Sequence, residues 1–133
     1  MDYFIDPKTS VQFLATAFLA ILFLQSGWDK ILDWKGNLDW LKGHFANSLL
    51  SGLVPVLLGT ITLFEMMAGV VSAVGAVFIL VTGSTELALL GAQISALSIL
   101  MLFFGQRMAK DYEGAATLAS YFLLTLFTIF LMI

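Results

Sequence analysis

Residues 53–82 read LVPVLLGTITLFEMMAGVVSAVGAVFILVT, a long apolar run that contains a single charged side chain, Glu65. A helix needs about 20 predominantly apolar residues to cross the hydrocarbon core of a bilayer, so this run is long enough to span a membrane. An ionisable side chain inside such a span is costly and is therefore a candidate for function. The stretch predicts a membrane helix and raises the question of what Glu65 contacts.

The composition of the whole chain is typical of a membrane protein. Of its 133 residues, 60% are hydrophobic and only 11% are charged, and the mean hydropathy is +0.99. Soluble domains carry about a quarter charged residues, so this chain lacks the side chains that would cover a water-facing surface. The net charge of -3 and the scattered basic residues provide no basic patch for nucleic acid. The chain has no cysteine, which excludes disulfides and thiolate metal sites.

Four apolar segments are each about as long as one membrane crossing. They are residues 10–31, 53–82, 85–106 and 114–133. The connections are short except for the one between the first two segments, and short connections place consecutive helices antiparallel. The chain is therefore predicted to be all-α, with one domain over residues 1–133 that forms an integral membrane four-helix antiparallel bundle.

The long connection, residues 34–47, is predicted to contain a short amphipathic helix in the membrane interface. Its apolar residues recur at spacings of four, three and four, which places them on one helical face: Trp34, Leu38, Leu41 and Phe45. Tryptophan is enriched at the level of the lipid headgroups, so we expect interface positions for Trp28, Trp34 and Trp40. The alternative is a solvated loop with stray aromatic residues.

Basic residues are distributed unevenly between the two expected sides of the membrane. One side has only Lys8, and the other has Lys30, Lys35, Lys42, Arg107 and Lys110. Cytoplasmic loops carry an excess of lysine and arginine, so residues 34–47 are predicted at the cytoplasmic surface and both termini outside.

Glu65 is predicted to point into the bundle. At about 100° per residue, the positions near it on the helix are mostly small. They are Thr62, Ala68, Gly69, Ser72, Ala73, Gly75 and Ala76, together with Leu58, Ile61 and Ile79. The opposite face carries bulky residues suited to lipid: Leu63, Met67, Val70, Val74, Val77 and Phe78. Rows of small residues allow membrane helices to approach closely.

Three polar residues in the later helices are candidates to meet Glu65: Gln93, Tyr121 and Thr125. At ~1.5 Å per residue, Glu65 lies about 15 Å, Gln93 about 18 Å and Tyr121 about 10 Å from the basic side. Tyr121 belongs to a hydroxyl stripe with Thr117, Thr125 and Thr128. Gln93 lies opposite the small residues of its own helix, which are Ala88, Gly91, Ser95 and Ser98. Either Gln93 faces a partner or the buried face of that helix is on its side.

Two roles remain open for Glu65. Burial in hydrocarbon disfavours a charge, so we expect a neutral carboxyl that donates a hydrogen bond and holds helices together. Alternatively, the same acid relays a proton or meets a ligand. Tyr121 is likewise either an ordinary packing residue or a ligand contact.

The end of the first segment, FLQSGWDKILDW at residues 23–34, concentrates polar side chains. Two rows with a spacing of four run to the surface side by side, one of Gln25, Asp29 and Asp33 and one of Ser26 and Lys30. Lys30 either extends to the headgroups or pairs with an acid, which is Asp29, Asp33 or an acid across the bundle. In the second case it would close the cytoplasmic end of a cavity.

Three features together resemble a known family. They are Ser26-Gly27-x-x-Lys30, Glu65 followed by Gly69, and residues 103–122, FFGQRMAKDYEGAATLASYF. They are similar to the DoxX family of small bacterial membrane proteins with four helices. The resemblance implies an inner-membrane protein, often a subunit, with a connection to quinone through thiosulfate:quinone oxidoreductase or to oxidative-stress complexes. It implies no catalytic residue.

Two functions from different classes remain open, and a third is weaker. The first is a quinone- or lipid-binding subunit of a membrane oxidoreductase. The second is a non-catalytic subunit that stabilises a larger envelope complex. The third is a small transporter or proton conductor, disfavoured because no helix is plainly interrupted at mid-depth. The candidate ligand or proton residues are Glu65, Tyr121, Gln93, Thr125, Gln25, Asp29 and Lys30.

Cofactor chemistry of the chain itself is not expected. His44 has no second ligand at metal spacing, so we interpret it as an interface residue and predict no metal site. The sequence offers no ligand set for flavin, haem or a metal centre, so electrons for a bound quinone would come from a partner protein. Whether the chain is itself an enzyme is left open.

Overall fold

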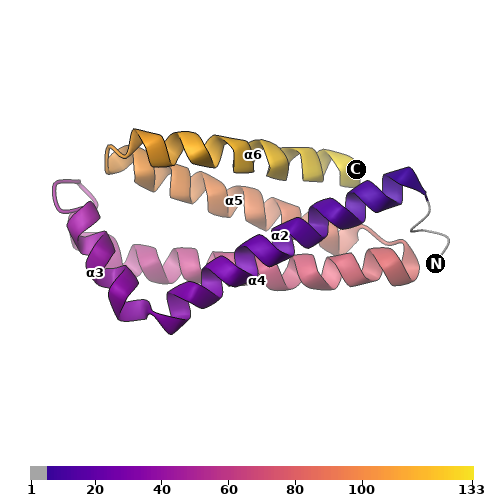
Figure 1. The fold of residues 1–133 in the computed structure, drawn as a ribbon, viewed down its shortest axis with the longest axis horizontal. Coiled ribbons are helices and arrows are strands. Elements are labelled where there is room, and N and C mark those ends of the chain that lie inside the picture. Colours follow the sequence, from indigo (N-terminus) through magenta and orange to yellow (C-terminus); the bar gives the residue numbers. More distant parts are fainter. Residues whose placement is uncertain (1–5) are drawn as a thin grey trace.

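A computed structural model describes residues 6–133, and this part of the chain contains helices and no strand. In chain order the elements are α2 (Pro7–Leu32), α3 (Trp34–His44), the 3-10 turn η1 (Ser51–Leu53), α4 (Val54–Thr82), α5 (Glu86–Met108) and α6 (Tyr112–Met132) (Figure 1). The all-α prediction is confirmed. The four long helices agree with the predicted ranges to within three residues at each end.

The helix ends follow from the local sequence. Pro7 and Pro55 lie in the first turns of α2 and α4, where a missing backbone N–H costs no hydrogen bond. After α4, Gly83 adopts a left-handed backbone (φ 77°) that directs its N–H to the last carbonyls of the helix. At the start of α6, the Asp111 carboxylate accepts a hydrogen bond from the Gly114 N–H at 3.0 Å. These residues fix where the chain turns between helices.

The four long helices lie along one another (Figure 1). α4 packs against α2 and α5, and α6 packs mainly against α5 and only lightly against α2. The start of α2 and the end of α6 lie at one end of the molecule, here called the terminal end, and α3 lies at the other, here called the α3 end. Each long helix is apolar enough to cross a membrane, which indicates a multi-pass membrane protein.

The predicted faces of α4 are confirmed. Glu65 is 1% exposed, and the small residues Ala68 and Ser72 beside it are fully buried. The six bulky residues expected on the opposite face, Leu63, Met67, Val70, Val74, Val77 and Phe78, are all exposed. The periodicity of small and large side chains therefore identifies the packed side of this helix.

Small residues bring α4 and α5 into close contact. A Cβ atom added to Gly75 would lie 2.6 Å from the backbone nitrogen of Ala88, and one added to Gly91 would lie 2.9 Å from that of Ser72. No side chain fits at such distances, so the two glycines set the spacing of the helices.

Most hydroxyl groups inside the assembly bond to their own helices, and Ser72, whose buried Oγ has no hydrogen-bond partner, is an exception. Five donate to the carbonyl four residues earlier at 2.7 to 2.9 Å, and they belong to Thr16, Thr62, Ser95, Ser98 and Thr128. Thr125 donates to the carbonyl of Phe122 at 2.7 Å. The stripe on α6 is thus buried at Thr125 and Thr128, but these hydroxyls are satisfied by backbone and are not offered to Glu65.

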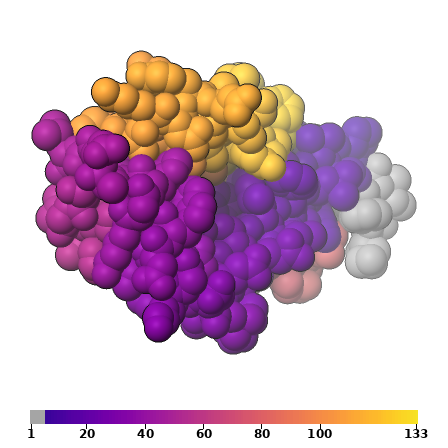
Figure 2. Space-filling model, turned by 60° about the vertical axis from the view of Figure 1, so that its left-hand side comes forward, coloured from indigo at the N-terminus to yellow at the C-terminus, as the bar shows by residue number. Residues whose placement is uncertain are grey.

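α3 lies over one end of the long helices (Figure 2). Leu38 and Leu41 are half-buried and Phe45 is buried, whereas Lys35 and Asp39 are exposed. A helix is confirmed over Trp34–His44, and it is shorter than the predicted segment 34–47 because the chain turns at Phe45. Trp34, the first residue of the predicted apolar face, is 38% exposed, and the location of the helix in the membrane interface stays a prediction.

Candidate functional site

The partner of Glu65 is Lys30. The Lys30 Nζ atom lies 2.9 Å from Glu65 Oε1 and donates a hydrogen bond to Ser26 Oγ at 2.8 Å, so it links α2 to α4. The Glu65 side chain is 1% exposed and that of Lys30 is 19% exposed. The angles at Oε1 fall outside those of a hydrogen bond, so the two groups form an ion pair held by charge.

This pairing decides between the alternatives for Lys30, because the lysine meets an acid across the helices. It also changes the expectation for Glu65, since the neighbouring group is an ammonium 2.9 Å away, which has no acceptor for the hydrogen bond that Glu65 was expected to donate. The depth count had offered Gln93 and Tyr121, and not Lys30, as neighbours of Glu65. α2 crosses α4 obliquely, so a residue near the end of α2 reaches the middle of α4 (Figure 1).

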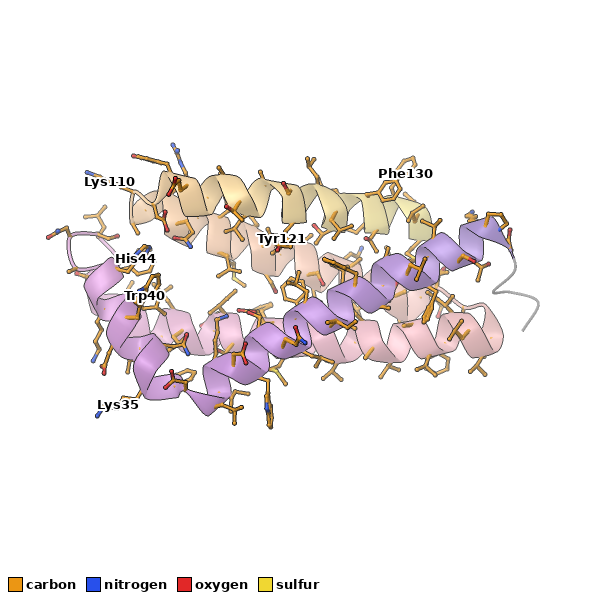
Figure 3. All side chains as sticks on the ribbon, in the orientation of Figure 1. Lys35, Trp40, His44, Lys110, Tyr121 and Phe130 are labelled. Atoms are coloured by element: carbon orange, nitrogen blue, oxygen red, sulfur yellow. The ribbon has the colours of Figure 1, made fainter. Side chains whose placement is uncertain are left out.

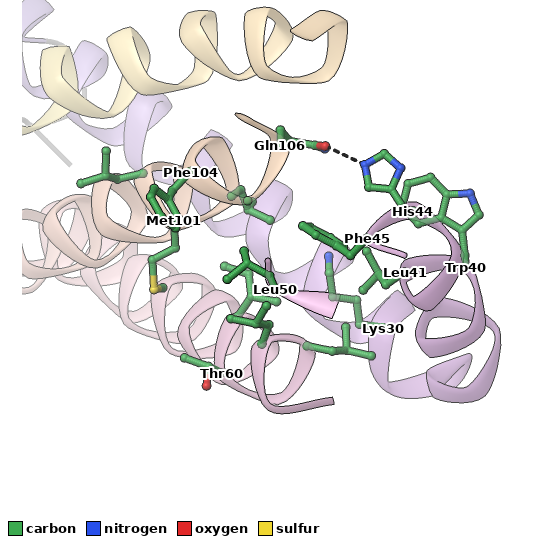
Figure 4. Close-up of a pocket in the computed structure, with 16 residues that line it drawn as sticks. Lys30, Trp40, Leu41, His44, Phe45, Leu50, Thr60, Met101, Phe104 and Gln106 are labelled. Atoms are coloured by element: carbon green, nitrogen blue, oxygen red, sulfur yellow. Dashed lines mark hydrogen bonds between the residues drawn. The ribbon is translucent and has the colours of Figure 1, made fainter. Parts of the chain in front are cut away.

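Lys30 is also part of the wall of a pocket of about 540 Å³ at the α3 end (Figure 4). The other walls come from α3, the loop that follows it, α4 and α5, and they are almost wholly apolar, with Leu41, Phe45, Ile61 and Met101 among them. Sites for small molecules typically have volumes of about 300 to 1,000 Å³ and a few polar groups in an apolar lining. The pocket therefore has the size and character of a ligand site.

The pocket opens to the side of the molecule. Leu100 and Phe104 of α5 line it and are themselves exposed on the outer surface, as is Thr60 of α4. Glu65 does not line the pocket and lies behind Lys30. A ligand would meet the ammonium and not the carboxylate.

His44 lies at the rim, where it connects α3 to the turn between α5 and α6. Its Nε2 atom is 3.1 Å from Gln106 Oε1 and 3.6 Å from Asp111 Oδ2, and its ring stacks on Trp40 with centroids 4.5 Å apart (Figure 4). The interpretation of His44 as a solitary interface residue is therefore incomplete. Within residues 6–133, no group of three or more His, Cys, Asp and Glu side chains could hold a metal ion.

The remaining candidates lie apart from the pocket. Tyr121 is half-buried in the middle of the assembly, away from Trp40 and His44 (Figure 3), and packs against the core cluster that contains Phe23. Gln93 is exposed, because the small residues of α5 form the buried face. The prediction that Gln93 shares an interior layer with Glu65 is therefore wrong.

Other predicted site residues near the end of α2 are also on the surface. Gln25 and Asp29 are exposed and line no part of the Lys30 pocket. Trp28, Trp34 and Trp40 are 54%, 38% and 60% exposed, as residues that contact lipid headgroups would be.

Sequence reasoning missed the residues that only tertiary contact brings together. Gln106 lies 62 positions from His44, and no local pattern relates the two. Gln12 was also missed, although its Nε2 donates to the Leu131 carbonyl at 2.8 Å and satisfies the end of α6. The sequence did indicate two residues of the pocket wall, because the spacing of Leu41 and Phe45 placed both on the apolar face of the predicted helix.

No family model matches the chain, and no curated protein or solved structure matches it significantly. The resemblance to the DoxX family therefore stays a prediction based on the motifs around Lys30, Glu65 and residues 103–122.

Proposed function

We propose that the chain is a multi-pass protein of the bacterial inner membrane, an antiparallel bundle that binds a quinone as a subunit of a membrane oxidoreductase. The observation that carries this proposal is the position of Lys30, a charged group in the wall of an otherwise apolar pocket whose charge Glu65 already balances.

The balance of charge favours a neutral ligand. An ammonium has three N–H donors. Ser26 accepts from one and Glu65 faces another, which leaves a donor for a group in the pocket. A quinone offers a neutral carbonyl oxygen on an apolar ring, which matches this donor and these walls. An anionic headgroup would find no net positive charge at the Lys30–Glu65 pair.

The side opening favours a ligand that arrives from the bilayer. Leu100 and Phe104 at the opening would face acyl chains if α5 crosses the membrane, so a long apolar tail could stay in lipid while the ring enters. The chain itself would bind and orient the quinone. A partner protein would supply the electrons.

The orientation of the protein follows from its basic end. Lys35 and Lys110 both lie at the α3 end, and Phe130 lies near the terminal end (Figure 3). The excess of basic residues favours a cytoplasmic α3 end with both termini outside. A reporter enzyme fused to the C-terminus tests this, because activity that requires the cytoplasm would reverse the orientation.

The quinone proposal is tested by binding to the purified protein in mild detergent. In a Trp28→Phe, Trp34→Phe background, the fluorescence of the pocket residue Trp40 is followed during titration with decylubiquinone and, separately, with phosphatidylglycerol. We expect saturable quenching by the quinone and no saturable response to the lipid.

Two glycine variants provide the matched comparison. Gly105 lines the pocket, so Gly105→Leu should weaken quinone binding about tenfold or more by filling it. Gly59 lies outside the lining, where an added Cβ would find only Trp34 at 3.9 Å, so Gly59→Leu should bind normally. Equal quenching of both variants would contradict the proposal. A stoichiometric protein partner without bound quinone would support the alternative, a non-catalytic subunit of an envelope complex.

A further inference from the structure

Gln93 is an amide exposed on an apolar helix face. It projects from the outer side of α5 and makes no hydrogen bond to any of residues 6–133. One turn away on either side are Leu90 and Leu97, which are 45% and 44% exposed, and Leu100 follows at 50%. These positions recur at spacings of three and four, the spacing of residues along the seam between two packed helices.

The depth of Gln93 makes an unpaired amide expensive. It lies seven residues from Glu86, or ~10 Å into the helix at ~1.5 Å per residue. α5 is one of the helices apolar enough to cross a membrane, and it carries no charge between Glu86 and Arg107. In hydrocarbon no water is present to satisfy a polar group, so a partner must do so.

Gln25 is the other exposed amide of the four long helices, and its surroundings differ. It lies at a similar level along α4, because a Cβ atom on Gly69 would meet Leu24 and one on Gly91 would meet Ser72. Its neighbours on α2 are polar, however, since Ser26, Asp29 and Lys30 follow it within five residues. Gln25 therefore belongs to a polar edge of α2, whereas Gln93 is flanked by exposed leucines on an apolar helix face.

We propose that Gln93 marks a contact between two copies of this chain, in which two α5 helices pack in parallel and the two Gln93 amides bond to each other. Copies with the same orientation in a membrane are related by a two-fold axis along its normal, so each residue of the contact faces its own counterpart. An amide has both donors and acceptors and is complementary to itself. The leucines above and below complete an apolar seam without charge repulsion.

This contact is independent of the quinone proposal, although the two regions adjoin. Leu90, Gln93 and Leu97 carry the contact and line no part of the pocket, whereas Leu100 lines the pocket and lies at the border between the two regions. Loss of quinone binding in Gly105→Leu would leave the association unchanged, which keeps the two proposals separable.

Single-cysteine cross-linking in membranes tests the contact, because the chain contains no cysteine of its own. Leu90→Cys and Leu97→Cys should each form a disulfide-linked dimer when copper phenanthroline is added. Val74→Cys, at a similarly exposed position on α4, is the control and should remain monomeric. Equal linkage at Val74 and Leu97, or linkage only to a different protein, would overturn the proposal.

A second comparison tests the amide itself. In the Leu97→Cys background, Gln93→Leu should lower dimer formation about three- to tenfold, as expected for one interhelical hydrogen bond in a membrane. Gln93→Asn, which keeps an amide, should retain part of the dimer, and Gln25→Leu should have no effect. Unchanged dimer formation in Gln93→Leu would remove the amide pair from the contact.

Discussion

At the terminal end, α4 and α5 approach until a Cβ atom on Gly75 would lie 2.6 Å from the backbone of Ala88. At the α3 end, the same two helices wall a pocket of about 540 Å³. Between α4 and α5, glycine-mediated contact closes one end, whereas the other end leaves space for a ligand beside a buried ion pair. The difference suggests that packing supplies stability at one end and leaves the other free for binding. Four predictions test that division.

The largest effect is expected at the ion pair. Lys30→Met strands the Glu65 carboxylate in an apolar interior, which should lower the free energy of unfolding by ~3 to 5 kcal/mol. Adding Glu65→Leu removes the stranded charge, so the double variant should recover most of the stability. Reversible unfolding in detergent measures both. A double variant as unstable as Lys30→Met would show that packing of the lysine stem, and not charge, dominates at the α3 end.

The next effect is expected at the glycine contact. Gly75→Ala introduces a methyl group where the Ala88 backbone leaves no room, so the free energy of unfolding should fall by ~1 to 3 kcal/mol. Gly59→Ala on the same helix meets only Trp34 at 3.9 Å, and alanine favours helix, so this control should be neutral or slightly stabilising. The same unfolding measurement compares them. Similar losses in both variants would mean that the two halves do not differ in packing.

A smaller effect is expected from the hydrogen bond that closes the terminal end. Gln12→Leu removes the donor to the Leu131 carbonyl and should cost ~1 kcal/mol. Gln25→Leu, an exposed amide on the same helix, should leave the free energy of unfolding unchanged. If the two variants behave alike, the bond from α2 to α6 contributes nothing.

The smallest effect is expected at the rim of the pocket. His44→Phe keeps an aromatic ring beside Trp40 but loses the bond to Gln106, so global stability should change little. Amide hydrogen exchange in α3 should become about threefold faster, because one neutral hydrogen bond contributes ~0.5 to 1.5 kcal/mol. Exchange that is unchanged in α3, or faster throughout α4 and α5, would contradict a local role for His44.

Local patterns account for the part of the fold that was predicted. The helix lengths follow from the lengths of the apolar runs. The buried face of α4 and the apolar face of α3 follow from the period of 3.6 residues, because each face is a property of a single helix. For the same reason the small residues of α5 identified its buried side, although the depth estimate argued for placing Gln93 there. The conflict between the two signals was informative, since it singled out an amide that lies among exposed leucines on α5 and makes no hydrogen bond to residues 6–133.

The sequence by itself determined four apolar helices, an amphipathic helix between the first two and a carboxylate on a face of small residues. Only the tertiary structure decided that Glu65 pairs with Lys30, because this depends on the oblique crossing of α2 over α4, which no single-helix count contains. The same holds for the bond from His44 to Gln106 across 62 positions. Periodicity fixes which way a side chain points from its own helix, whereas its partner depends on the angle and offset at which two helices pack.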